Sequence, residues 1–207
     1  MKKAILIILA FIYANSLDAQ NNMEMAKQEV NTFLNSLATN VGTDNYKMFG
    51  LKSPEEAKQL QADQVFSSTI IALDRLKKYE GTDAKDLVTN IDRFVCTVIN
   101  RQTQQTVGIV DLEYQKERYL VKGYASSDVS AALGKIDKQL FKQNFSLVRV
   151  PALNVYFGSF TGADNQMKFV SLQSNPTLRT EIGEIRPAAE FLKQLVPLAN
   201  QYNGLPW

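Results

Sequence analysis

Residues 109–122, IVDLEYQKERYLVK, decide the fold class of this chain, because one register of self-pairing satisfies both their hydrophobic and their charged side chains. If Lys116 and Glu117 form a two-residue turn, Tyr114 faces Tyr119 across the two strands. The same register pairs Leu112 with Val121, Asp111 with Lys122 and Gln115 with Arg118. Hydrophobic alternation and charge pairing agree, so this stretch predicts an antiparallel hairpin.

The predicted hairpin has one apolar face and one mainly charged face, because successive side chains of a strand point to opposite sides. The apolar face carries Val110, Leu112, Tyr114, Tyr119 and Val121. Asp111 and Glu113 share the other face, and two carboxylates on one face could serve acid–base chemistry. Lys122 opposite Asp111 supplies an ordinary surface ion pair, however, so we interpret these carboxylates as part of a solvated sheet face.

Five further strands are expected from β-branched and apolar stretches, at 65–73, 94–99, 145–150, 153–160 and 167–172. A polar connection over 80–90 precedes the second of these strands. Turn residues at 161–165 join the last two into another hairpin. Pro151 cannot donate to a ladder, so it marks a bulge or an edge between its flanking strands.

Helices are expected at 25–38, at 54–61, from Ser126 or Ser127 to 141, and from Pro187 onward. The first, third and last repeat apolar residues at a spacing of three and four, as one helical face does. The second begins with the capping-box pattern of Ser53 and Glu56. The third would carry a stripe of three lysines on its wet side, and Pro197 should kink or end the last helix.

This element order predicts an α+β fold with about seven antiparallel strands in two groups and helices packed on the sheet. The succession of strands, helix and strands would also fit a duplicated helix-plus-sheet unit. Residues 20–207 are expected to form a single α+β domain, which is long enough to bury a sizeable core.

The first nineteen residues have the regions of a secretory signal peptide. Lys2 and Lys3 precede an apolar run over 4–14, which is shorter than the roughly 20 residues that a membrane-spanning helix needs. Cleavage is expected after Ala19, with a cut after Ser16 as the lesser option. The sequence therefore predicts an exported protein, periplasmic or extracellular, with no stable membrane insertion.

Composition excludes several kinds of site. The chain has no histidine and one cysteine, Cys96, which removes Ser/His/Asp and Cys/His nucleophile arrangements, the usual zinc sites and any intramolecular disulfide. Phe94, Cys96 and Val98 alternate along a strand, so Cys96 is predicted to be a buried core thiol. Without the first nineteen residues the net charge falls from +2 to +1, which argues against nucleic acid as a partner.

No catalytic, cofactor-binding or metal-binding residue can be assigned from the sequence, and no cofactor is expected. The favoured hypothesis is an exported, non-enzymatic binding or interaction module of the bacterial envelope, whose partner is a protein or another envelope component. The alternative is a carboxylate-dependent hydrolase of envelope glycans, which needs no histidine. A deep cleft with two carboxylates would favour the hydrolase, and a shallow face with an open strand edge would favour the binding module.

Overall fold

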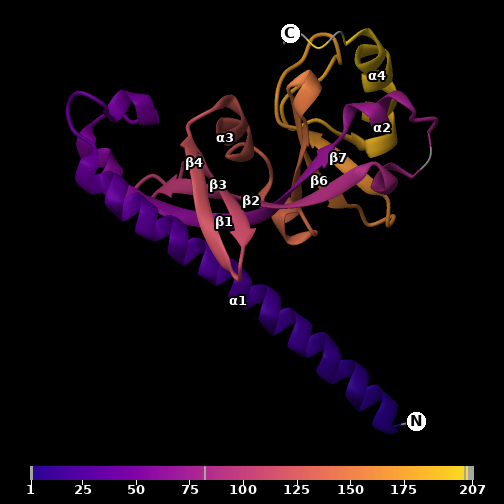
Figure 1. The fold of residues 1–207 in the computed structure, drawn as a ribbon, viewed down its shortest axis with the longest axis horizontal. Coiled ribbons are helices and arrows are strands. Elements are labelled where there is room, and N and C mark those ends of the chain that lie inside the picture. Colours follow the sequence, from indigo (N-terminus) through magenta and orange to yellow (C-terminus); the bar gives the residue numbers. More distant parts are fainter. Residues whose placement is uncertain (1, 82, 203, 205–207) are drawn as a thin grey trace.

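The fold is α+β and is built on one mixed sheet (Figure 1). It is known from a computed structural model that describes residues 2–81, 83–202 and 204, with side chains from residue 21 onward. The strands are β1 (Leu60–Ile71), β2 (Val88–Asn100), β3 (Thr106–Gln115), β4 (Arg118–Ala125), β5 (Ser146–Val150), β6 (Val155–Thr161), β7 (Met167–Ser171) and β8 (Ile185–Pro187). They form an eight-stranded sheet in the order β4-β3-β2-β1-β5-β6-β7-β8.

The expectation of two antiparallel groups is wrong. β5 pairs with β1 in parallel, and this pair joins strands β1–β4 and strands β5–β8 into one sheet. The chain leaves β4 at one edge of the sheet and crosses to its middle before β5 begins. A parallel pair needs such a crossover, whereas antiparallel neighbours need only a short turn. Every other neighbouring pair in the described sheet is antiparallel.

The hairpin β3–β4 confirms the predicted register near its turn and corrects it farther away. Tyr114 faces Tyr119, and Lys116 and Glu117 have φ angles of 51° and 61°, as a type I′ turn requires. A β-bulge then shifts the register between Asp111 and Leu112. Asp111 therefore lies opposite Gly123, and the predicted pairing of Asp111 with Lys122 is wrong.

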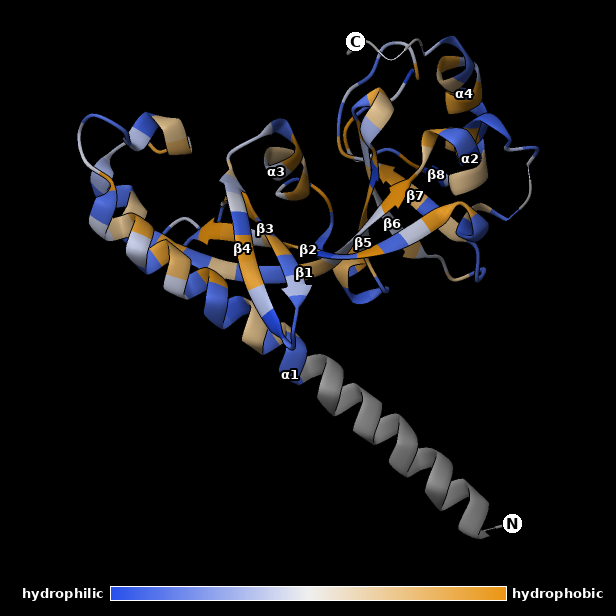
Figure 2. Cartoon of the chain, in the orientation of Figure 1, coloured by the Kyte–Doolittle hydropathy of each residue, from blue (hydrophilic) through white to orange (hydrophobic). Residues whose placement is uncertain are grey.

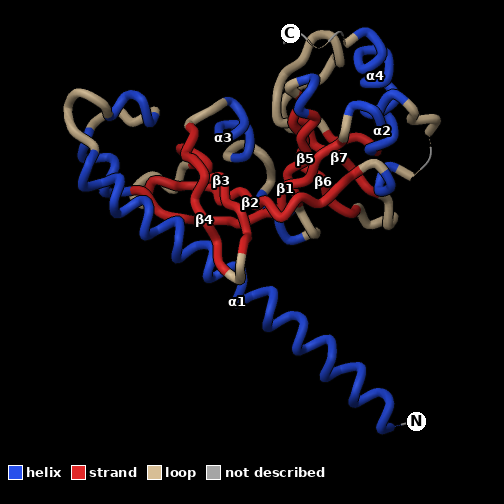
Figure 3. Tube along the Cα trace, in the orientation of Figure 1, coloured by secondary structure: helices blue, strands red, loops and turns tan. Residues whose placement is uncertain are grey.

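The helical segments are α1 (Lys2–Asn40), α2 (Leu73–Lys77), α3 (Asp128–Leu133), α4 (Ala188–Gln201) and the single 3-10 turns η1 (Tyr46–Phe49), η2 (Pro54–Gln59), η3 (Ala84–Asp86), η4 (Lys138–Lys142) and η5 (Pro151–Leu153). Figure 3 shows short helical turns within the connecting segments. The sequence pattern missed α2, β8 and most of the 3-10 turns, because segments of three to five residues are too short to repeat a helical or strand period. Pro197 lies inside α4, which continues to Gln201.

The predicted long helix after Ser127 is wrong beyond its first turns. Ser127 is the N-cap, as expected, and forms a capping box with Ser130. The helix ends before Gly134, a poor helix former, and the Asp137 side chain accepts a hydrogen bond from Gln139 N to start η4 instead. The expected lysine stripe therefore does not lie along one helix.

The capping box predicted at Ser53 is also absent. The Ser53 side chain makes no capping hydrogen bond, although Pro54 does open a helical turn. The Glu56 carboxylate instead accepts from Lys52 N at 2.6 Å and from the Asn100 amide at 3.3 Å. The second bond ties η2 to β2, and the first engages the Glu56 side chain with Lys52 N in place of the Ser53 N that a capping box requires.

Helices lie on both faces of the sheet (Figure 2). The buried apolar side chains between helices and sheet form three clusters. On one face, α1 covers β1–β4 around Cys96, while α2 and α4 cover β5–β7 around Phe157. On the other face, α3 packs over Val95 and Ile109. The buried face of α4 is the predicted one and includes Ala188, Phe191, Leu192 and Leu195.

Candidate functional site

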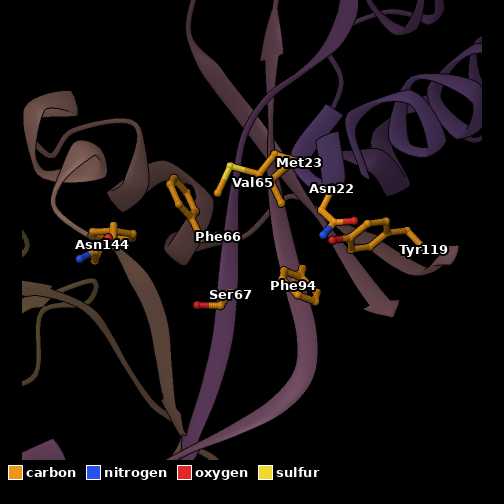
Figure 4. A pocket seen from close by; sticks show the side chains of 9 residues that line it. Asn22, Met23, Val65, Phe66, Ser67, Phe94, Tyr119 and Asn144 are labelled. Carbon is orange, nitrogen blue, oxygen red and sulfur yellow. The ribbon is translucent and has the colours of Figure 1, made fainter. Parts of the chain in front are cut away.

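A hollow with a cavity volume of about 370 Å³ opens beside β1 (Figure 4). We call it the Met23 hollow. Its lining comes from α1, β1, β2, β4 and the residues that lead into β5: Asn22, Met23, Val65, Phe66, Ser67, Phe94, Tyr119, Asn144 and Phe145. The volume lies within the range of roughly 300–1,000 Å³ that is usual for small-molecule sites.

The Met23 hollow exists because β1 is much longer than its neighbour β5. β5 pairs only with Ser67–Ile70 of β1, so the earlier half of β1 has no strand on that side. Helix α1 protects part of this free edge, where the Asn31 side-chain oxygen accepts from Ala62 N at 3.0 Å. The hollow opens between that contact and the start of β5, with Met23 beside Val65 and Asn144 beyond Phe66 (Figure 4).

All nine lining residues of the Met23 hollow are uncharged. Its aromatic side chains hold each other in edge-on and tilted contacts, with ring centroids 5.3 Å apart for Phe94 and Tyr119 and 4.8 Å apart for Phe66 and Phe145. Burial raises the pKa of Tyr119, so its phenol stays neutral. The arrangement suits an uncharged, mainly apolar group that hydrogen-bonds to a few amide or hydroxyl groups.

The carboxylates singled out in the sequence lie on the face opposite Cys96, and both are ion-paired. Glu113 bonds Lys122 at 2.7 Å and lies 3.7 Å from Arg93. The hydrogen bond from Lys122, helped by both cations, holds the pKa of Glu113 below its usual value. Asp111 pairs with the Arg149 guanidinium instead of Lys122. The interpretation as ordinary ion pairs is confirmed, with the partner of Asp111 corrected.

A second hollow, of about 360 Å³, lies on this face between α3, β3, β5 and β6. We call it the Arg149 hollow. Its polar lining includes Asp111, Asp128, Arg149, Asn154, Tyr156 and Gln173. Sequence reasoning missed this site because its members are distant in the chain. The signal that could have found it is Arg149 itself, a charged residue that stands between two buried valines of β5.

The Arg149 hollow brings two carboxylates together, Asp111 and Asp128, and Asp111 is already ion-paired with Arg149. Among the described residues, the carboxyl groups with a clearly shifted pKa are all lowered, and none of them lines either hollow: Glu55, Glu113, Asp164 and Glu184. Within the described residues, no group of three or more metal-ligating side chains could hold an ion.

Cys96 is fully buried, as predicted, and burial raises its pKa to about 12. A thiol with so high a pKa carries almost no thiolate at neutral pH, which excludes it as a nucleophile.

Among the helices in the described part of the chain, none is long and apolar enough to cross a membrane.

Comparison of the chain with protein-family models, with curated proteins and with solved structures finds no match. The functional argument therefore rests on the chemistry of the two hollows.

Proposed function

We propose that this protein is an exported, non-enzymatic binding module of the bacterial envelope, and that the Met23 hollow holds an uncharged, mainly apolar group of its ligand. The observation that carries the proposal is the uncharged lining of a ligand-sized hollow, with aromatic walls and few polar groups. A charged group would lose its hydration there without gaining an opposite charge. An apolar group would gain free energy by leaving water.

Binding is favoured over glycan hydrolysis by the state of the carboxylates. Asp111 and Asp128 line one hollow, as the hydrolase alternative would need, but Asp111 is already engaged by Arg149. Asp111 would have to leave this ion pair before its carboxylate could act on a substrate. The hydrolase therefore remains the weaker alternative.

The edges of the sheet favour a hollow over strand addition as the binding mode. β4 is an edge strand, but its pairing with β3 is interrupted by a bulge and it carries Lys122. β8 is only three residues long and ends in Pro187. Bulges, lysine and proline are the usual devices that keep an edge from pairing with another chain.

Export and the Met23 hollow are compatible, because either expected cleavage site leaves Asn22 and Met23 in the mature protein. Expression with the native leader in a bacterial host should yield mature protein that begins at or near Gln20. N-terminal sequencing of the exported protein measures this. Recovery of Met1 would contradict export by cleavage without affecting the binding proposal.

The binding proposal can be tested with N-phenyl-1-naphthylamine, a neutral apolar dye that fluoresces in apolar surroundings. The mature protein should bind it at one saturable site. Met23→Lys places a charge at the wall of the hollow and should abolish the fluorescence increase. Met48→Lys is the matched control, since Met48 is exposed and does not line the hollow.

Two results would overturn the assignment of this site. One is the absence of saturable dye binding to the folded wild-type protein. The other is equal binding by wild type, Met23→Lys and Met48→Lys, which would place the dye elsewhere. Both substitutions change exposed side chains, so circular dichroism should show wild-type folding in each variant.

A further inference from the structure

The Arg149 hollow has a polar floor that the sheet order alone would not produce. Asp111 lies on β3 and Arg149 on β5, and strands β2 and β1 run between them. Strands are spaced by about 4.8 Å, so a flat sheet would hold these two backbones ~14 Å apart. The two side chains therefore reach toward each other over the intervening strands and close the floor of the hollow.

A register shift in the β3–β4 ladder lies beside Asp111. Leu112 faces Val121 and Asp111 faces Gly123, so the extra residue of the bulge is Lys122 on β4. Asp111 keeps the regular alternation of β3, which points its side chain to the face that carries the hollow. Leu112 keeps its place in the opposite core, where it is fully buried.

The guanidinium of Arg149 is only partly satisfied by the protein. It donates to the Asp111 carboxylate, but its Nε is buried and has no hydrogen-bond partner. A buried donor without an acceptor costs free energy. An oxygen atom that enters the hollow could accept from this guanidinium after a small rotation of the side chain and remove that cost.

The rim of the hollow presents amide groups and an aromatic ring. Asn154 adopts a left-handed conformation with φ 51°, and its carbonyl accepts from the Gln173 side chain at 3.3 Å. Tyr156, two residues along the chain, is half-buried and contributes its ring to the lining. The hollow thus combines carboxylates, a guanidinium, two amides and one aromatic side chain.

We infer that the Arg149 hollow is a second binding site, and that its ligand is a neutral saccharide. Each sugar hydroxyl both donates and accepts, so it matches a lining that mixes acceptor carboxylates, donor guanidinium and amides that do both. The apolar face of a sugar ring can lie against Tyr156. Two carboxylates and one guanidinium give the lining a net charge of −1, which disfavours an anionic ligand. Arg149 already neutralises Asp111, which weakens the attraction of the hollow for a cation.

The test uses the mature protein, and ¹H–¹⁵N correlation spectra report binding of defined trisaccharides. The neutral probes are maltotriose, cellotriose and N-acetylglucosamine trimer, and the charged probes are the glucosamine trimer and trigalacturonic acid. At least one neutral trisaccharide should bind in the millimolar range or tighter, and more tightly than either charged trimer. Dye binding at the Met23 hollow should be unchanged by the sugar, which separates this inference from the proposed function.

Two variants locate the sugar. Tyr156→Ala should weaken binding about tenfold through loss of the ring contact. Asn154→Gly keeps the left-handed backbone while removing the amide, and should weaken binding about fivefold, as expected for one hydrogen bond. Asn165→Gly is the matched control, because Asn165 has φ 59° in the exposed turn between β6 and β7 and should leave affinity unchanged.

Three outcomes would overturn the inference. The first is that no neutral trimer binds at about 10 mM, a concentration that corresponds to a binding free energy of roughly 3 kcal/mol. The second is tighter binding of a charged trimer than of every neutral trimer. The third is equal affinity of Asn154→Gly and Asn165→Gly for the sugar. Asn154→Gly decides the matter even if Tyr156→Ala fails to fold, because glycine accepts the same backbone conformation.

Discussion

The two faces of β3 differ in how completely they are covered. Val110 and Leu112 point into a closed core under α1, and both are fully buried. Asp111 and Glu113 alternate with them and point to the opposite face, where both are partly exposed and ion-paired. The stretch of α1 from Ala26 to Leu37 packs on the first face, whereas α3 has only six residues, so α3 covers Ile109 and leaves the strand beyond it open.

This difference shows that helix length, more than strand pattern, decides where the molecule has a core and where it has a site. The strand pattern alternates equally on both faces of β3. On one face the long helix buries Val110 and Leu112 and leaves Tyr114 partly exposed, and on the other the short helix leaves space that charged groups and a hollow occupy.

The largest expected effect is the protection of Cys96 on the closed face. A neutral, fully buried thiol with a pKa of about 12 should react with a thiol reagent orders of magnitude more slowly in the native protein than in denaturant. Absorbance at neutral pH after addition of a disulfide reagent measures both rates. Rapid stoichiometric labelling of the folded protein would mean that α1 does not close this face.

Leu112→Ala should have the largest effect on stability in this strand. It removes a fully buried side chain from the core under α1, which typically costs about 2 to 5 kcal/mol of unfolding free energy. Urea unfolding of the mature protein measures the change. A cost below about 1 kcal/mol would show that the face is loosely packed or solvent-accessible.

Asp111→Asn, on the open face next to Leu112, should cost no more than about 1 kcal/mol, because both members of the ion pair with Arg149 are partly exposed. The same urea titration provides the comparison. If Asp111→Asn cost more than Leu112→Ala, the contrast between the two faces would be inverted.

Local pairing was predictable from the sequence where short-range rules determine it. The turn at Lys116 and Glu117, the apolar face of the hairpin and the N-cap at Ser127 all follow from neighbouring residues. The ion pair of Asp111 with Arg149 does not, because its two members are 38 residues apart in the chain. A surface ion pair with Lys122 and a longer-range pair with Arg149 are equally compatible with the strand pattern.

The topology and the two hollows could not be predicted, for a related reason. The parallel contact between β1 and β5 joins segments that are about 80 residues apart, and hydrophobic alternation carries no information on which strands become neighbours. The Met23 hollow arises from the unequal lengths of β1 and β5. Strand ends are the least predictable part of an element, so a site formed by such ends is not visible in the sequence.

The smallest expected effect concerns Glu113 and depends on pH. Its pKa is lowered in the folded protein, first by the hydrogen bond from Lys122, so the ionised form is stabilised relative to the unfolded chain. This contribution is present above the ordinary pKa of 4.5 and is lost as the pH falls through the lower, folded-state pKa. The stability difference between wild type and Glu113→Gln should therefore be present at pH 7, shrink below pH 4.5 and be reduced by salt, because the pair is partly exposed. Glu117→Gln, in the exposed turn of the same hairpin, is the control for the loss of one carboxylate. A pH-independent difference for Glu113→Gln would indicate that its side chain stabilises the open face by packing and not by its charge.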